Sequence, residues 1–311
     1  MSAKILGLHH VTAIAGNAKR NHEFYTKILG LRLVKKTVNF DDPGTYHFYY
    51  GNETGEPGTI LTFFPWEGIR KGSIGTGQAT STSFTIPENS IPFWLNRFQE
   101  YDVIYNNPTE RFQEEALTFL DPDGLKLELV ASSKNDQRKP WTTKGINSTK
   151  AIKGFYNVTL TLEGYQRTAD LITDLFGYEV ADEYINRFRF INKNWETADI
   201  LDLVCLPSGK GGSVSGGSVH HIAFRVANEV EQLEIREKLL EKGFNTTPQL
   251  DRNYFKSVYF REPGGVLFEI ATDPPGFTAD EEINNLGQEL KLPDWLEPRR
   301  KEIEDVLPKL D

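Results

Sequence analysis

The chain has 311 residues, of which 38% are hydrophobic and 25% are charged, a composition typical of globular proteins with one or two domains. Its formal net charge of −9 and the lack of a basic cluster argue against a nucleic-acid partner. The single cysteine, Cys205, excludes an intramolecular disulfide and a cysteine-rich zinc site. Because the sequence has neither a leader pattern nor an apolar run long enough for a membrane span, we expect a cytoplasmic protein without a membrane partner.

The first stretch of the chain predicts a strand, a helix and three more strands. Residues 5–14 alternate in polarity and predict a strand. Residues 17–29 carry apolar side chains at helical spacing and end at Gly30, as a helix with a C-terminal glycine does. Turn-rich sequences then separate three apolar runs, which predict strands at 31–37, 45–50 and 59–64.

The same order of elements recurs three times. The second unit has predicted strands at 80–86, near 102–106, at 115–120 and at 125–131, with a helix at 91–101. The third begins with a strand at 156–162 and has a helix that ends at Gly177. The fourth begins with a strand at 219–226, and a helix at 230–242 and strands at 255–261 and 266–271 follow.

These units predict an α+β fold of four βαβββ modules, paired into curved mixed sheets that enclose a cavity. We expect a first half at 1–131 with two modules, a linker at 132–153, and a second half at 154–272 with two modules. Residues 273–311 predict a helical C-terminal tail, with an acidic helix at 278–290.

Two modules begin with a pair of histidines, and these pairs point to a metal site. At the start of the first strand the four modules carry His10, Ser81, Asn157 and His221. At the middle of the last strand we align Phe63, Glu128, Leu203 and Glu269. Two histidines and one carboxylate are the ligand set of non-haem iron(II) oxygenases. The first and last modules alone complete this set, so we expect them to face each other across a metal, with Glu128 left in a structural role.

The alternation of side chains along a strand selects one histidine of each pair. His221 shares a face with Ala223 and Arg225, which suits a wet cavity, whereas His220 shares the apolar face that packs against a helix. The same alternation makes His10 the ligand in the first module, where it shares a strand face with Thr12. His9 and His220 then either support the ligands or are hydrogen-bonded core histidines.

Two other histidines lack this context. His22 lies on the first predicted helix and suits the surface. His47 lies in an aromatic strand, where a core position is more typical, although a position in the cavity wall stays open.

The modules, their Leu-Gly helix ends and their Asp/Glu-Pro-x-Gly closings resemble the vicinal oxygen chelate superfamily over residues 5–272. Within that superfamily, the two His-His pairs and the sequence Leu-Pro-Asp-Trp-Leu at 292–296 resemble the ring-cleaving dioxygenases that act on hydroquinones. The resemblance implies Fe(2+) held by His10, His221 and Glu269, and an enzyme that inserts O2 into a small dihydric phenol.

The resemblance also implies that five residues line or support the site: His9, Thr12, His220, Arg252 and Tyr259. We expect His220 or His9 to take the phenolic proton, and Tyr259 or Arg252 to stabilise the developing negative charge. Without the resemblance, Arg252 suits a solvated surface position and Tyr259 a half-buried strand position.

Several alternatives remain open from the sequence. They are a glyoxalase-type lyase, a metal-dependent thiol transferase, an ordinary extradiol catechol dioxygenase and a drug-binding module without metal. Manganese or zinc in place of iron and a homo-oligomeric state also remain open.

Overall fold

The computed structural model describes residues 3–310 of the chain. Its first module has β1 (Leu8–Ala15), α1 (Ala18–Glu23) continued by the π-helix η1 (Phe24–Ile28), β2 (Arg32–Asn39), β3 (Asp42–Gly51) and β4 (Ile60–Pro65). The second module has β5 (Gln78–Pro87), α2 (Ile91–Glu100), β6 (Thr109–Arg111), β7 (Glu114–Leu120) and β8 (Lys126–Ser132).

The later modules repeat this order. The third has β9 (Gly154–Leu162), α3 (Gln166–Phe176), β10 (Tyr178–Tyr184), β11 (Arg187–Asn192) and β12 (Ile200–Cys205). The fourth has β13 (Ser218–Val226), α4 (Glu229–Glu241), β14 (Leu250–Asp251), β15 (Lys256–Arg261) and β16 (Leu267–Thr272). The tail contains η2 (Phe277–Ala279), η3 (Ile283–Asn285), η4 (Glu297–Arg299) and α5 (Arg300–Val306).

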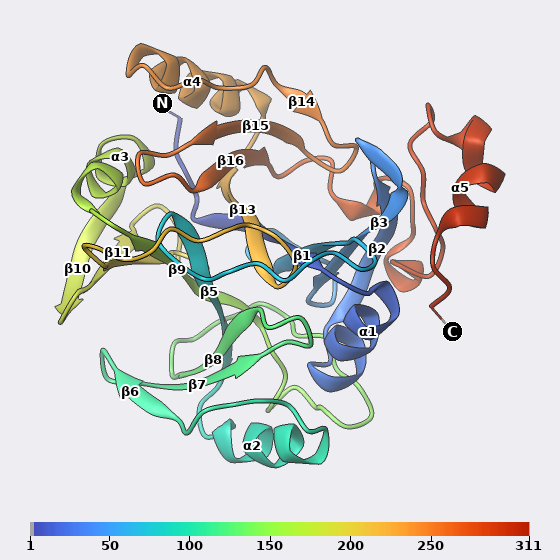
Figure 1. The fold of residues 1–311 in the computed structure, drawn as a ribbon, viewed down its shortest axis with the longest axis horizontal. Helices are drawn as coiled ribbons and strands as arrows, with labels where there is room; N and C mark the ends of the chain where they lie inside the picture. Colours follow the sequence, from blue (N-terminus) through green and yellow to red (C-terminus); the bar gives the residue numbers. More distant parts are fainter. Residues whose placement is uncertain (1–2, 311) are drawn as a thin grey trace.

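The modules pair in a crossed order to form two eight-stranded sheets. The first sheet has the order β14-β15-β16-β13-β1-β4-β3-β2, and the second has the order β10-β11-β12-β9-β5-β8-β7-β6. The central strands β1 and β13 pair antiparallel, as do β5 and β9 in the other sheet. The predicted fold class is therefore confirmed, and the first module shares a sheet with the fourth (Figure 1).

Each sheet takes one module from each half of the sequence repeat. The halves 1–131 and 154–272 are thus units of the sequence repeat and not of the sheets. That they are domains stays a prediction. The segment between them has no named helix or strand. Arg138 ties this segment to both sheets, because its guanidinium donates to the carbonyls of Gly58 and Phe155.

The strands pack their apolar faces against the helices and leave their other faces to the inside of each curved sheet. In β13, Ile222 and Phe224 are fully buried in the main hydrophobic core, which α3 and α4 help to enclose. The helix α3 ends at Gly177, whose φ of 72° is a left-handed conformation that glycine adopts without strain. The polar inner faces are consequently free to form sites.

Two predicted elements are wrong. The expected strand at 102–106 is a loop with a single bridge from Tyr105, since the chain turns at Asp102 with φ 51° and pairing resumes at β6. The expected helix at 278–290 consists of short 3-10 turns, because its carboxylates reach Lys35 of β2 instead of solvent. The final helix α5 lies beside β3 (Figure 1).

None of the helices formed by residues 3–310 has the length and apolar character needed to cross a membrane.

Candidate metal centre

Three ligand atoms from β1, β13 and β16 meet on the inner face of the first sheet. His10 Nε2 lies 3.3 Å from His221 Nε2 and 3.3 Å from Glu269 Oε2. His221 Nε2 lies 2.9 Å from the same carboxylate oxygen. Among residues 3–310, these three side chains form the cluster of potential metal ligands. The structure thus brings together the three ligands that the sequence predicted.

The triangle of donor atoms fits a divalent metal. Adjacent ligands of an octahedral ion with bonds of about 2.1 Å stand about 3 Å apart, close to the three separations observed here. All three side chains are buried, and Glu269 Oε2 makes no hydrogen bond within the described residues. Its other oxygen, Oε1, accepts from the Ser257 hydroxyl. A buried carboxylate oxygen without a donor is a costly arrangement unless a cation completes it.

Electrostatics also favour a charged carboxylate at this place. Burial raises the pKa of Glu269, but the neighbouring His10 and His221 outweigh it and hold the pKa well below its usual value. Burial lowers the pKa of His221. Metal binding requires an ionised carboxylate and neutral imidazoles, and the lowered pKa values of Glu269 and His221 agree with that state.

Each ligand histidine is held by the preceding histidine in the chain. His9 Nδ1 lies 2.9 Å from His10 Nδ1, and His220 Nδ1 lies 2.7 Å from His221 Nδ1. A ligand that binds metal through Nε2 carries its proton on Nδ1, so it donates to the Nδ1 of its neighbour. The neighbour then carries its own proton on Nε2. For His9 this agrees with a hydrogen bond to the backbone of Thr272.

A cavity of about 230 Å³ opens in front of the triad. Its apolar walls come from the side chains of Phe40, Phe64, Trp66, Phe255 and Leu267. Its polar lining includes Thr12, His220, Arg252 and Tyr259, four of the five residues implied by the resemblance. The fifth, His9, is buried behind His10 and does not line the cavity.

Arg252 and Tyr259 come from the fourth module. The Arg252 guanidinium stands over the Tyr259 ring at 5.6 Å and forms an ion pair at 3.3 Å with Asp41, which lies between β2 and β3. The Tyr259 ring lies 5.5 Å from the His221 ring. Burial raises the pKa of Tyr259, so this phenol stays protonated at neutral pH and keeps an O–H that can donate to a ligand.

The register of β4 corrects the alignment made from the sequence. Thr62 pairs with Thr12 across the two strands, just as Glu269 pairs with Ala223 in the fourth module. Thr62 therefore occupies the position that we assigned to Phe63, whose ring packs into the core at 4.6 Å from Tyr25. In the third module, Asp202 likewise replaces Leu203. The position in the first module that corresponds to Glu269 is thus a threonine.

His47 and Tyr49 of β3 were not among the predicted site residues, and both line the cavity. Burial lowers the pKa of His47 well below its usual value. The alternation that places Thr62 inward also places His47 and Tyr49 inward, since Tyr49 pairs with Thr62. That alternation was available in the sequence, but the one-residue error on β4 concealed it.

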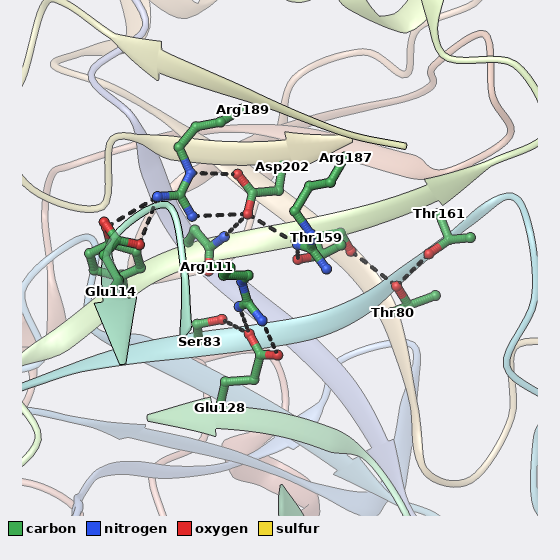
Figure 2. Close-up of polar contacts among 12 residues, drawn as sticks. Thr80, Ser83, Arg111, Glu114, Glu128, Thr159, Thr161, Arg187, Arg189 and Asp202 are labelled. Carbon is green, nitrogen blue, oxygen red and sulfur yellow. Dashed lines mark hydrogen bonds and ion pairs between the residues drawn. The ribbon is translucent and has the colours of Figure 1, made fainter. Parts of the chain in front are cut away.

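In the second sheet the equivalent positions form no cluster of potential metal ligands among residues 3–310, and ion pairs occupy them instead (Figure 2). Glu128, the counterpart of Glu269, accepts two hydrogen bonds from Arg111 and one from Ser83 at 2.7 Å. Asp202 accepts from Arg189 and also from Asn157, the counterpart of His10. Arginines thus provide the positive charge that a metal would provide in the first sheet.

The chain was compared with known proteins. The model of the Glyoxalase/Bleomycin resistance protein/Dioxygenase superfamily matches residues 7–129 and 157–270. MhqO of Bacillus subtilis (strain 168), provisionally named a ring-cleaving dioxygenase, is 45% identical over 307 residues, covering 99% of this chain and 97% of that protein. The chlorohydroquinone/hydroquinone 1,2-dioxygenase of Sphingobium indicum is 33% identical over 309 residues, covering 96% and 95%.

A solved structure agrees with these relatives. The crystal structure of a provisionally assigned dioxygenase from Bacillus subtilis subsp. subtilis str. 168 matches with a TM-score of 0.95 and 44% identity, over 100% of this chain and 99% of that one. The predicted resemblance is thereby confirmed. The chain belongs to the glyoxalase/bleomycin resistance protein/dioxygenase superfamily, in its branch of hydroquinone-type ring-cleaving dioxygenases.

Proposed function

We propose that this protein is an iron(II)-dependent dioxygenase that cleaves the ring of a hydroquinone-type dihydric phenol. The observation that carries the proposal is the triangle of His10, His221 and Glu269, with Thr62 at the position where a fourth ligand would stand. Two histidines and one carboxylate leave several coordination positions open, as oxygen chemistry requires. The name of the Sphingobium relative supports the choice of hydroquinones.

The cavity suits a small aromatic substrate. Phe64, Trp66 and Phe255 give the ring apolar contacts and exclude water from the reacting atoms. Bound iron supplies a Lewis acid for the phenolic oxygen and a path for electrons from the ring to O2. Arg252 and Tyr259 provide a positive charge and a hydroxyl donor on one wall, where negative charge develops during oxygen reduction.

The tautomers of the supporting histidines change their proposed roles. His220 accepts from His221 at Nδ1, and its Nε2 therefore carries a proton that points away from the ligand. Burial lowers the pKa of His220 to about 4, so the ring is neutral at pH 7. We therefore propose His220 as a hydrogen-bond donor to oxygen and His9 as a support for His10. Neither is then free to take the phenolic proton.

Oxygen uptake after anaerobic reconstitution with iron(II) tests this function. We expect uptake with hydroquinones and a much slower reaction with catechols. A preference for catechols would indicate an ordinary extradiol dioxygenase. No uptake with either substrate would contradict the proposal and favour a lyase, a thiol transferase or a binding protein.

A further inference from the structure

A continuous chain of four hydrogen-bonding side chains crosses the inner face of the first sheet. Thr12 Oγ1 of β1 lies 2.9 Å from Thr62 Oγ1 of β4. Thr62 Oγ1 lies 2.9 Å from His47 Nε2 of β3. His47 Nδ1 in turn lies 2.9 Å from the Tyr49 hydroxyl. Each link has the length of a normal hydrogen bond.

Both ends of this chain reach the cavity, and so does His47, which leaves Thr62 as the one link closed off from it. Thr12 and Tyr49 line the cavity, whereas Thr62 is fully buried and does not. Thr12 pairs with His221 in the neighbouring strand and follows His10 on the same face of β1, so it stands beside the metal triad. Tyr49 stands two strands away on β3, where its ring packs against Phe277 of the tail.

The chain can hold its protons in two directions without losing a hydrogen bond. A neutral imidazole has one N–H donor and one acceptor nitrogen, and burial lowers the pKa of His47 well below its usual value. In one direction Tyr49 donates to His47, which donates to Thr62, and the Thr12 proton points into the cavity. In the other direction every donor and acceptor is exchanged, and the Thr12 oxygen is left as an acceptor.

We propose that Thr12, Thr62, His47 and Tyr49 form a proton relay that serves as the base for the phenol. This inference rests on the proposed function and adds the group that its mechanism lacks. The phenolic O–H bond breaks and its proton binds Thr12 Oγ1, while the Thr12 proton passes to Thr62 and the Thr62 proton to His47 Nε2. The proton on His47 Nδ1 passes to Tyr49, whose own proton passes to water in the cavity and from there to bulk solvent. No electrons move, and all four residues end neutral.

The other histidines of the site are poor bases for the phenol once His10 and His221 bind a metal through Nε2. His9 and His220 then accept from the ligand histidines at Nδ1, and each presents a proton and no lone pair at Nε2. Neither ring nitrogen of His47 contacts another histidine. Its hydrogen bonds instead run to two hydroxyl groups, which accept and donate protons equally well. His47 is thus the residue of this wall that can move a proton in both directions.

Strand β3 provides a matched control for the relay. Tyr49 and the next residue, Tyr50, are both buried, and they point to opposite faces. The Tyr50 hydroxyl donates to Asn21 on the core side, 3.0 Å away. Tyr49→Phe and Tyr50→Phe therefore remove the same atom from neighbouring positions, and only the first breaks the relay. Thr62→Val and Thr62→Ser form a second pair, because serine restores the hydroxyl.

The test is the rate of proton release when hydroquinone is mixed under argon with the iron-loaded protein, followed with a pH indicator in a stopped-flow instrument. We expect Tyr49→Phe and Thr62→Val to slow this release by about a hundredfold, the usual contribution of a positioned base. Tyr50→Phe and Thr62→Ser should stay within about threefold of the unmodified protein, and the affinity for hydroquinone should change little in all four. The kcat for oxygen uptake should fall in the same two variants.

The outcomes separate the relay from the proposed function. Unchanged proton release and kcat in Tyr49→Phe and Thr62→Val, in a protein that consumes oxygen with hydroquinone, would overturn the relay and leave the function intact. An unmodified protein that neither releases a proton nor consumes oxygen with hydroquinone would contradict the function itself.

Discussion

At the scale of single residues, the paired histidines divide one task between two side chains. In the proposed metal centre, His10 and His221 present Nε2 to the metal, and His9 and His220 accept the remaining N–H of each ligand. Such partners fix the tautomer and the orientation of a ligand ring. Glu269 is the third proposed ligand, because its Oε2 is buried between the two ligand rings without a hydrogen-bond donor.

Replacing Glu269 by glutamine tests the ligand assignment. The substitution keeps the shape of the side chain and removes the negative charge that balances a divalent metal. We expect iron content and oxygen uptake to fall together, measured by metal analysis and an oxygen electrode on the same sample. Full iron content and full uptake in Glu269→Gln would show that the ligand assignment is wrong.

At the scale of elements, β8 and β16 are equivalent strands of the second and fourth modules, and their glutamates have different partners. Glu269 of β16 faces two histidines, whereas Glu128 of β8 is neutralised by Arg111. The surrounding pairs in the second sheet involve Asp202, Arg187 and Arg189 (Figure 2). The second sheet thus carries its charge balance within the protein, and in the first sheet we propose that a metal ion supplies it.

This contrast predicts different effects on stability. Glu128→Gln leaves the largely buried Arg111 without its counter-charge, and breaking a buried ion pair costs about 3–5 kcal/mol. In the metal-free protein, Glu269→Gln removes a buried charge that has no arginine partner and should cost far less. Urea denaturation of both metal-free variants measures the difference. Equal losses would contradict the distinct roles of the two glutamates.

The pH dependence of stability follows from the same ion pair. Burial raises the pKa of Glu128, but hydrogen bonds and charge from Arg111 outweigh it and lower the pKa to about 2. An unfolded glutamate has a pKa of about 4.3, so the stabilisation is complete above that pH and is lost as the pH falls toward 2. We expect the free energy of unfolding to fall more steeply below pH 4.3 in the unmodified protein than in Glu128→Gln. If the free energy of unfolding fell equally steeply with pH in both proteins, the Glu128–Arg111 pair would not be the origin of the pH dependence.

At the scale of the whole molecule, the ligand count predicted the pairing of distant modules. No two modules adjacent in sequence supply two histidines and a glutamate, and the structure joins the first with the fourth. Local patterns also located most strands, because their alternation of polar and apolar residues reflects one buried face.

The errors came from contacts between distant residues. Asp280 and Glu281 lie in the segment 278–290, whose pattern is typical of an exposed helix. Both instead pair with Lys35, which is fully buried in β2. That partner lies more than 240 positions away in the chain, and no local pattern reveals it. The one-residue error at Phe63 had a similar origin, since only the register with β1 shows that Thr62 points inward.

Anomalous diffraction at the iron edge, from crystals of the iron-loaded protein, tests the central claim most directly. The account predicts one strong peak at about 2.1 Å from His10 Nε2, His221 Nε2 and a Glu269 oxygen, joining the first and last modules, with no peak beside Glu128. A peak at Glu128, or full iron occupancy at any site that lacks these three residues, would contradict it.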